Sequence, residues 1–148
     1  GLCLVEERDG VFREGLKPGE KSGIPKRDPV PDDLPWKREM NPDVVQLFRY
    51  SAITFNPHRI HYDRTYAMEV EGYPGLVVHR PFTTQCLLDF ARDMTPDKTL
   101  TKFDMRARAP LFDTAPFTVC GRPTDEGCEV WAATPEGTVA MQAQVTLA

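Results

Sequence analysis

The chain has 148 residues, of which 41% are hydrophobic and 27% are charged, and its formal net charge is −4. This length fits one domain and leaves no room for a second full one, because domains commonly run from about 100 to 200 residues. Acidic and basic residues are interspersed along the chain without the basic stripe of a nucleic-acid groove, so we expect no nucleic-acid partner.

Signals for membrane insertion or export are missing from the sequence. No apolar run approaches the roughly 20 residues that a bilayer-spanning helix needs, and the first residues lack a charged segment followed by an apolar one. We therefore expect a cytoplasmic protein without a membrane partner. The four cysteines, which form no Cys-x-x-Cys pair, are expected to be reduced thiols. They are Cys3, Cys86, Cys120 and Cys128.

The first forty residues are predicted to lie outside the main folded unit. Residues 1–13 mix apolar and charged positions in a way that is typical of one strand whose partners lie elsewhere. Residues 14–40 are rich in Pro, Gly, Lys and Asp, a composition that favours an extended linker over a packed core. The folded domain is therefore predicted to cover residues 41–148.

Three helices are predicted in the first half of this domain. The first begins at Asn41-Pro42-Asp43, because Asn caps a free helix end and Pro suits the first helical position. Its apolar residues recur at helical spacing and predict one buried face. They are Val44, Val45, Leu47, Phe48 and Ala52.

The second predicted helix is short, and the third is long. The second covers residues 63–68, with Asp63 as its cap. The third runs from about Pro81 to Asp93 and carries apolar residues on one face. The residues on that face are Phe82, Cys86, Leu87, Phe90 and Ala91.

Beyond residue 95 the hydrophobic period changes from that of a helix to that of a strand. Apolar and polar residues alternate over residues 102–108, and Pro, Gly and Asp separate three later apolar runs, 116–122, 128–134 and 138–148. The short connections between them predict an antiparallel meander. Because the long helix must bury its apolar face, the predicted class is α+β, with an antiparallel sheet wrapped around one central helix.

Two of the three histidines lie within residues 54–63, TFNPHRIHYD. The longer stretch YSAITFNPHRIHYDRTYA, residues 50–67, resembles the hydratase signature of the MaoC-like hot-dog family of (R)-specific enoyl-CoA hydratases and 3-hydroxyacyl-thioester dehydratases. The form FN-x-HRIHYD is similar to a subgroup that includes hydratases of mesaconyl-CoA and itaconyl-CoA. The similarity covers residues 40–148 and implies the hot-dog fold.

The resemblance implies roles for His61 and Asn56. The catalytic His of the family pattern falls on His61, and its catalytic Asp falls on Asn56. A histidine suits both proton transfers of a hydration, whereas an amide can only orient the attacking water. Two other roles remain open: His61 as a buried histidine bonded to a backbone carbonyl, and Asn56 as a turn residue before Pro57.

Further site residues follow from the same resemblance. In the family the central helix opens after a His-Gly step, which here is His79-Arg80, and the N–H of Arg80 is expected to hold the thioester oxygen. His79 either orients this loop or is a core histidine, and Asp63 either positions substrate or caps a helix. Four arginines either contact the phosphates of CoA or are simply solvated. They are Arg59, Arg64, Arg106 and Arg108.

Other functions remain open from the sequence. A metal site built on His58, His61 and Asp63 would lack a further well-spaced ligand, so we expect neither a metal nor another cofactor. A thioesterase on the same fold would use a carboxylate of the central helix, for which Asp89 is the candidate. The change from Asp to Asn56 also allows a non-catalytic subunit that binds acyl-CoA.

The resemblance also implies a partner. Hot-dog sheets of this family pair edge to edge, so we expect a homodimer or pairing with a second hot-dog domain, with an acyl-CoA thioester as substrate. Residues 1–13 look like the last strand of a preceding hot-dog domain.

Overall fold

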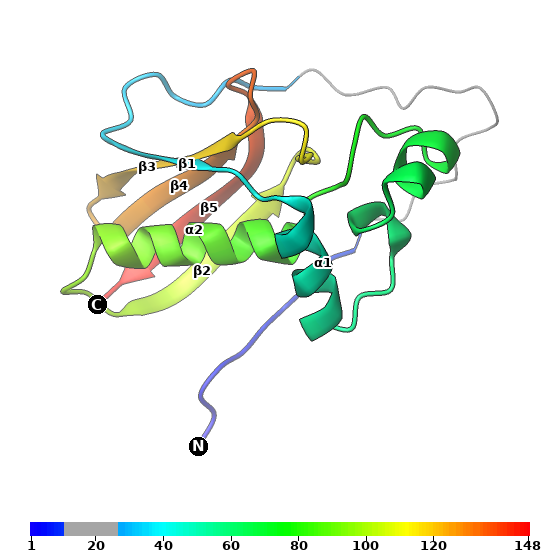
Figure 1. Cartoon of the computed structure of the whole chain (residues 1–148). Helices are drawn as coiled ribbons and strands as arrows, with labels where there is room; N and C mark the ends of the chain where they lie inside the picture. The colour runs from blue at the N-terminus through cyan, green and yellow to red at the C-terminus, as the bar shows by residue number, and fades with distance from the viewer. Residues whose placement is uncertain (11–26) are drawn as a thin grey trace.

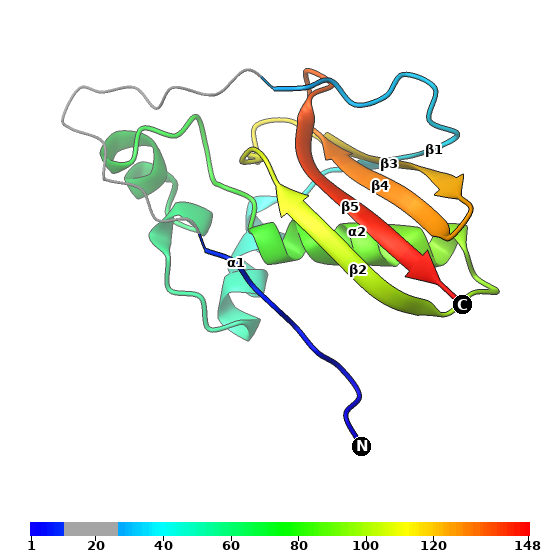
Figure 2. The same ribbon diagram turned by 180° about the vertical axis from the view of Figure 1, so that it is seen from behind.

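The computed structural model describes residues 1–10 and 27–148. Its centre is a five-stranded antiparallel sheet in the order β1-β3-β4-β5-β2, which curves around the helix α2 (Figures 1 and 2). The strands are β1 (Trp36–Met40), β2 (Leu100–Ala107), β3 (Phe117–Thr124), β4 (Gly127–Ala133) and β5 (Val139–Leu147). The helical elements are α1 (Val44–Ile53), the 3₁₀ turn η1 (Arg59–His61), the π-helical segment η2 (Tyr66–Val70) and α2 (Arg80–Met94). This arrangement confirms the predicted α+β class.

The core lies between α2 and the concave face of the sheet. Helix α2 matches the predicted third helix closely and buries Leu87, Phe90 and Ala91. Along β5, alternate side chains point to this core, as the period of two predicts. The buried partners on the sheet include Phe117, Val119, Val130, Met141, Ala143 and Val145.

The sheet differs from a simple meander at one edge. Strands β3, β4 and β5 follow one another through short turns, but β2 pairs with β5. The connection from β2 to β3 spans residues 108–116 and is long enough to cross the two intervening strands. It also passes the start of α2, where Leu111 O accepts from Val78 N–H at 2.8 Å. The crossover therefore lies beside the segment that leads into the central helix.

The N-terminal segments differ from the sequence prediction in one respect. The strand predicted for residues 1–13 is not formed in residues 1–10, and residues 11–13 lie outside the described part. The predicted linker, described from residue 27, contributes β1 to the sheet, because Trp36–Met40 pairs with β3. Leu34 also packs against Trp131 on the convex face. Packed structure therefore begins before residue 41.

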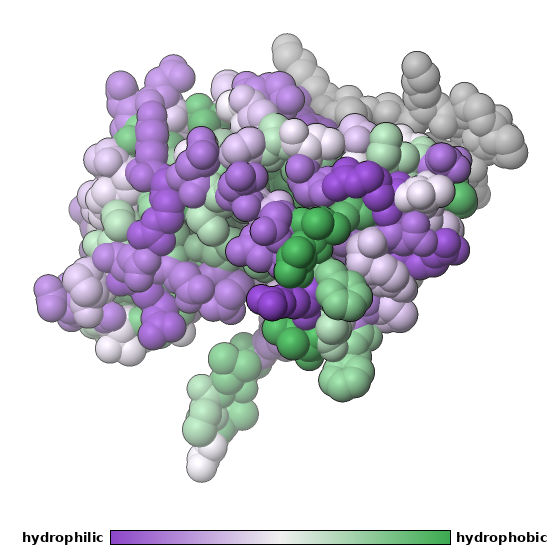
Figure 3. All heavy atoms as spheres, in the orientation of Figure 1, coloured by the Kyte–Doolittle hydropathy of each residue, from purple (hydrophilic) through white to green (hydrophobic). Residues whose placement is uncertain are grey.

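Helix α1 has a narrower buried face than its sequence predicts. It begins with a capping box in which Asp43 and Gln46 exchange hydrogen bonds, and it buries Leu47 and Ser51. The predicted burial of the other four apolar residues was wrong, because α1 lies at one end of the molecule and touches the core along one stripe. The four exposed residues are Val44, Val45, Phe48 and Ala52. Figure 3 shows hydrophobic side chains gathered over this helix.

The segment after η1 contains the predicted short helix, which is longer than predicted and partly π-helical. Asp63 Oδ1 accepts from Tyr66 N–H at 3.0 Å, so Asp63 has the predicted capping role. The helix continues as the π-helical segment η2 to Val70, beyond the predicted end at residue 68.

Over residues 1–10 and 27–148, no helix has the length and apolar content needed to cross a bilayer.

Candidate functional site

The two segments before α2 bring His61 and His79 face to face. His61 ends η1, His79 caps α2, and Val77 N–H donates to Ile60 O at 3.0 Å, which ties the two segments together. The imidazole rings stack with centroids 3.8 Å apart and an interplanar angle of 18°. Both residues are buried, with exposed fractions of 8% and 1%. The sequence motif therefore forms a histidine pair at the start of the central helix.

The hydrogen bond of His61 fixes its tautomer. Its Nδ1 lies 2.7 Å from Val77 O, and because a carbonyl oxygen can only accept, Nδ1 must carry the hydrogen. The lone pair is then on Nε2, which has no hydrogen-bond partner among the described residues. Burial lowers the pKa of His61 below its ordinary value, and nearby His58 lowers it further, which outweighs the bond to Val77. His61 is thus a neutral imidazole with a free basic nitrogen.

His79 is held by a residue that the sequence analysis did not identify. Its Nε2 lies 2.8 Å from Ser51 Oγ, and its Nδ1 is enclosed without a partner in the described part of the chain. Burial, and then the proximity of His61, lower the pKa of His79 to about 4. The sequence signal for Ser51 was its position one turn after Leu47, on the buried stripe of α1.

Two buried neutral histidines make stability depend on pH. Unfolded histidines bind a proton near pH 6.5, whereas folded His79 does so only near 4, so the unfolded state binds more protons between these values. We expect the free energy of unfolding to fall as pH drops from 6.5, by up to about 1.4 kcal/mol per pH unit for each histidine. Urea denaturation between pH 5 and 8 measures this slope.

The matched variants for this experiment are His79→Asn and His58→Asn. Replacing buried His79 should flatten the slope between pH 5 and 6.5, because a buried group that titrates differently in the two states is removed. Replacing exposed His58 should leave most of the slope in place. Equal slopes in the parent and in His79→Asn would contradict the prediction.

The first turn of α2 offers an unpaired donor next to the histidine pair. Arg80 is the first residue of the helix, and its N–H has no backbone acceptor among the described residues. Among the described non-glycine residues a positive φ occurs at Phe55, so Arg80 has an ordinary negative φ. Its backbone conformation therefore does not require the freedom of glycine. Free N–H groups at a helix N-terminus attract negative charge. Arg80 therefore retains the donor that the sequence predicts.

The loop between α1 and η1 places Asn56 differently from its predicted role. Asn56 Oδ1 accepts from His58 N–H at 3.0 Å, the geometry of a turn-forming Asn, so the oxygen expected to contact water already has a partner. Phe55 has φ of 53°, a left-handed conformation that favours glycine. The catalytic role of Asn56 stays a prediction.

Several predicted charged site residues are already paired. Asp63 Oδ2 accepts from Arg59 at 2.7 Å, and the Tyr66 N–H and Arg59 lower the pKa of Asp63. Arg64 forms an ion pair with Asp113. Arg106, on β2, and Arg108, just after it, have no ion-pair partner among the described residues.

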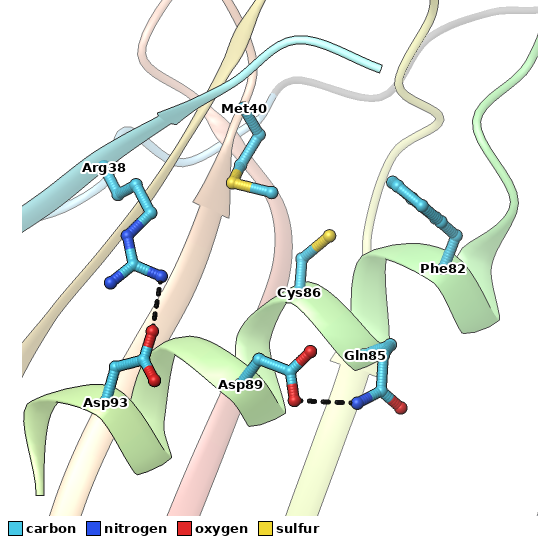
Figure 4. A pocket seen from close by; sticks show the side chains of 7 residues that line it. All are labelled: Arg38, Met40, Phe82, Gln85, Cys86, Asp89 and Asp93. Atoms are coloured by element: carbon cyan, nitrogen blue, oxygen red, sulfur yellow. Dashed lines mark hydrogen bonds and ion pairs between the residues drawn. The ribbon is translucent and has the colours of Figure 1, made fainter. Parts of the chain in front are cut away.

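Two cavities lie near α1 and α2. One, of about 350 Å³, is lined by Phe48, Ser51, Ala52, Phe55, Asn56, Pro57 and Tyr62. The other, of about 510 Å³, runs along α2 below β1 and contains Asp89, the candidate carboxylate of a thioesterase (Figure 4). Asp89 accepts from Gln85 at 2.9 Å there, and neither His61 nor His79 lines this cavity. Within residues 1–10 and 27–148, no group of three or more His, Cys, Asp or Glu is arranged to hold a metal ion.

Comparison with known proteins gives close relatives. The family model described as hydroxyacyl-thioester dehydratase type 2 matches residues 1–113. The chain is 44% identical to "Mesaconyl-C(4)-CoA hydratase" of Chloroflexus aurantiacus over 99% of its own length and 51% of the relative's. It is 37% identical to "Hydroxyacyl-thioester dehydratase type 2, mitochondrial" of Schizosaccharomyces pombe over 80% of the chain and 39% of the relative. It thus spans about half or less of these relatives.

The fold is also found among solved structures. The ChsH1–ChsH2 complex from Mycobacterium tuberculosis matches with a TM-score of 0.66 and 18% identity, covering 78% of this chain and 93% of that one. This similarity confirms the hot-dog fold that the sequence resemblance implied. Together with the family match over residues 1–113, it shows that the chain belongs to the hydroxyacyl-thioester dehydratase type 2 family, a MaoC-like hot-dog family.

Proposed function

We propose that the protein is a hydratase/dehydratase that adds water to, or removes it from, the double bond of an acyl-CoA thioester. One observation carries the proposal: His61 is a buried neutral imidazole whose Nδ1 is committed to Val77 O and whose Nε2 is free. A base in this state can take a proton from water and return it to carbon. The related proteins are a hydratase and a dehydratase of acyl thioesters, which supports the same reaction class.

In the proposed hydration, His61 Nε2 removes a proton from a water molecule, and the water oxygen bonds to the β-carbon. The electron pair of the double bond moves toward the thioester, so negative charge develops on the carbonyl oxygen. The Arg80 N–H, at the positive end of α2, stabilises this charge. The imidazolium then gives its proton to the α-carbon. Dehydration follows the same steps in reverse.

The remaining predicted site residues differ in whether their polar groups are still free to bind substrate. Arg106 and Arg108 are our candidates for the CoA phosphates, because they lack ion-pair partners in the described part of the chain. They come just before the connection in which Leu111 contacts Val78, next to the start of α2. Arg59 and Arg64 already pair with carboxylates. Asn56 contributes its NH₂ group, because its oxygen is bonded to His58. His79, directly before Arg80, is proposed to position the loop that leads into α2.

The substrate is proposed to be a branched or dicarboxylic enoyl-CoA, on the strength of the 44% identity to a mesaconyl-C4-CoA hydratase. The experiment follows the absorbance of the enoyl-thioester band with crotonyl-, mesaconyl- and itaconyl-CoA. We expect the band to disappear with at least one of them, without release of thiol.

Two outcomes would replace this proposal. Thiol release without hydration would show a thioesterase, with Asp89 as the candidate catalytic carboxylate. Binding of acyl-CoA without either reaction would assign a non-catalytic subunit, consistent with the change from Asp to Asn56.

We also propose that the working unit contains a second hot-dog domain, either from another copy or from the rest of a longer protein. Two observations support this proposal. The chain covers 51% of the length of the mesaconyl-C(4)-CoA hydratase, and one of the similar structures, ChsH1–ChsH2, is a complex of two subunits. Sedimentation at micromolar concentration should then give a species larger than the monomer, and a stable monomer without a second hot-dog domain would contradict the proposal.

A further inference from the structure

Ser51 lies between the buried histidine pair and a cavity. It is 6% exposed, on the inner stripe of α1, with its Oγ 2.8 Å from His79 Nε2. It also lines the cavity of about 350 Å³. Most of the other lining residues are apolar: Phe48, Ala52, Phe55 and Pro57. A hydroxyl in this position joins a buried imidazole to a mostly hydrophobic recess.

The enclosed nitrogen of His79 indicates the direction of this hydrogen bond. Its Nδ1 is buried without a partner among the described residues, whichever tautomer is present. If Nδ1 carried the hydrogen, a buried N–H would be left unsatisfied, which is rarer in proteins than an unsatisfied acceptor. The favoured tautomer therefore has its hydrogen on Nε2 and donates to Ser51 Oγ.

This direction leaves the hydroxyl hydrogen of Ser51 available. In the described chain, Ser51 Oγ has His79 as its hydrogen-bond partner and makes no bond to a carbonyl of its own helix. Other polar groups of the cavity are committed, since Asn56 Oδ1 accepts from His58 N–H and Tyr62 Oη donates to Pro57 O. Besides the NH₂ of half-buried Asn56, Ser51 is therefore the side-chain donor left for a ligand.

We propose that Ser51 is a catalytic residue of the proposed hydration, donating its hydroxyl hydrogen to the thioester carbonyl oxygen, with His79 as its positioning residue. The inference rests on the proposed function. The Ser51 hydroxyl and the Arg80 N–H then form a two-donor site for the developing negative charge, and the acyl group occupies the apolar recess. A neutral His79 suits this role, because only the neutral ring can both donate to Ser51 and stack on His61 without charge repulsion.

The experiment compares the full chain with Ser51→Ala, Ser51→Thr and Thr84→Ala. Ser51→Ala should lower kcat/KM for enoyl-CoA hydration by about a hundredfold, mainly in kcat, as for loss of one donor to a developing oxyanion. Ser51→Thr keeps the hydroxyl and should recover much of the rate. Thr84→Ala removes a hydroxyl that bonds to Arg80 O on α2 and should change the rate less than threefold.

A binding measurement separates this inference from the proposed function. Saturated butyryl-CoA cannot be hydrated, and Ser51→Ala should weaken its binding by about three- to tenfold, the usual value of one neutral hydrogen bond, without affecting free CoA. Weaker butyryl-CoA binding in a protein that hydrates nothing would keep Ser51 as a hydrogen-bond donor to the thioester carbonyl and refute the hydratase. Unchanged kcat/KM in an active Ser51→Ala variant would refute the role of Ser51 alone. A parent without binding or turnover refutes both.

The tautomer of His79 gives a second readout, which tests the assigned direction of the hydrogen bond to Ser51. Nitrogen NMR of the folded chain at pH 7 should show His79 with its hydrogen on Nε2. In Ser51→Ala this signal should shift, because the acceptor of that hydrogen has gone. A hydrogen on Nδ1 in the parent would overturn the assigned direction and with it the proposal.

Discussion

Replacement of His61 by alanine is expected to lower kcat/KM for enoyl-CoA hydration by about a thousandfold, the middle to upper part of the usual range for loss of a general acid–base. The variant keeps the fold's central helix and its free Arg80 N–H, but it loses the free Nε2 that is proposed to carry the proton. Steady-state kinetics with the best substrate, together with a thermal melt of the variant, measure the effect.

His58→Ala is the matched control, because His58 is an exposed histidine three positions earlier on the same loop. Its kcat/KM should stay within a few fold of the parent. The pH profile adds a second check: the neutral form of His61 is the active one and its pKa is lowered, so kcat/KM should rise through a pKa below 6.5 and then level off. Equal losses in the two variants would remove His61 from the mechanism.

Phe90→Ala is expected to lower the free energy of unfolding by about 3–5 kcal/mol, as for other large-to-small changes of buried aromatic residues. Phe90 is 1% exposed and lies on the face of α2 that packs on the sheet. Its removal leaves a cavity where helix and sheet meet, and a rigid sheet can collapse into that space only in part. Urea or thermal denaturation measures the loss.

Phe55→Ala is the control for this change, because it removes the same ring from a position that is 91% exposed. Surface substitutions commonly change stability by less than about 0.5 kcal/mol. A comparable loss in both variants would mean that the interface between α2 and the sheet is not the main source of stability.

The fold was predictable where a periodic pattern coincides with burial. Helix α2 buries Leu87, Phe90 and Ala91 at helical spacing, and β5 alternates over residues 141–145, so each pattern predicts its own structure. The neighbour of β2 was not predictable, because the pairing with β5 depends on a crossover and not on local sequence. Strand β1 was hidden for a related reason: as an edge strand it tolerates the polar sequence WKREM after a proline-rich segment.

Helix α1 shows the limit of periodicity for a helix at the end of a domain. Its apolar residues have the right spacing, yet the core reaches only Leu47 and Ser51. The sequence shows which residues are apolar, but the packing of neighbouring elements determines which of them are buried.

The sequence pointed to the main candidate residue of the site but not to its contacts. The signature around His61 predicts a base by resemblance, a role that stays a prediction, and the start of α2 follows from Pro81 and helical spacing. The tautomer of His61 depends on Val77 O, and the state of His79 depends on Ser51, twenty-eight residues away in the chain. Such pairs arise from tertiary packing, so no local motif could reveal them.

Val77 has a mechanical consequence for turnover. Its N–H is bonded to Ile60 and its C=O to His61, while the short run from Val77 to Arg80 leads directly into α2. The proposed base and the proposed backbone donor are therefore joined through a few peptide units, which set their separation. A short link of this kind keeps the distance between the two groups fixed during turnover, whatever the exposed loops do.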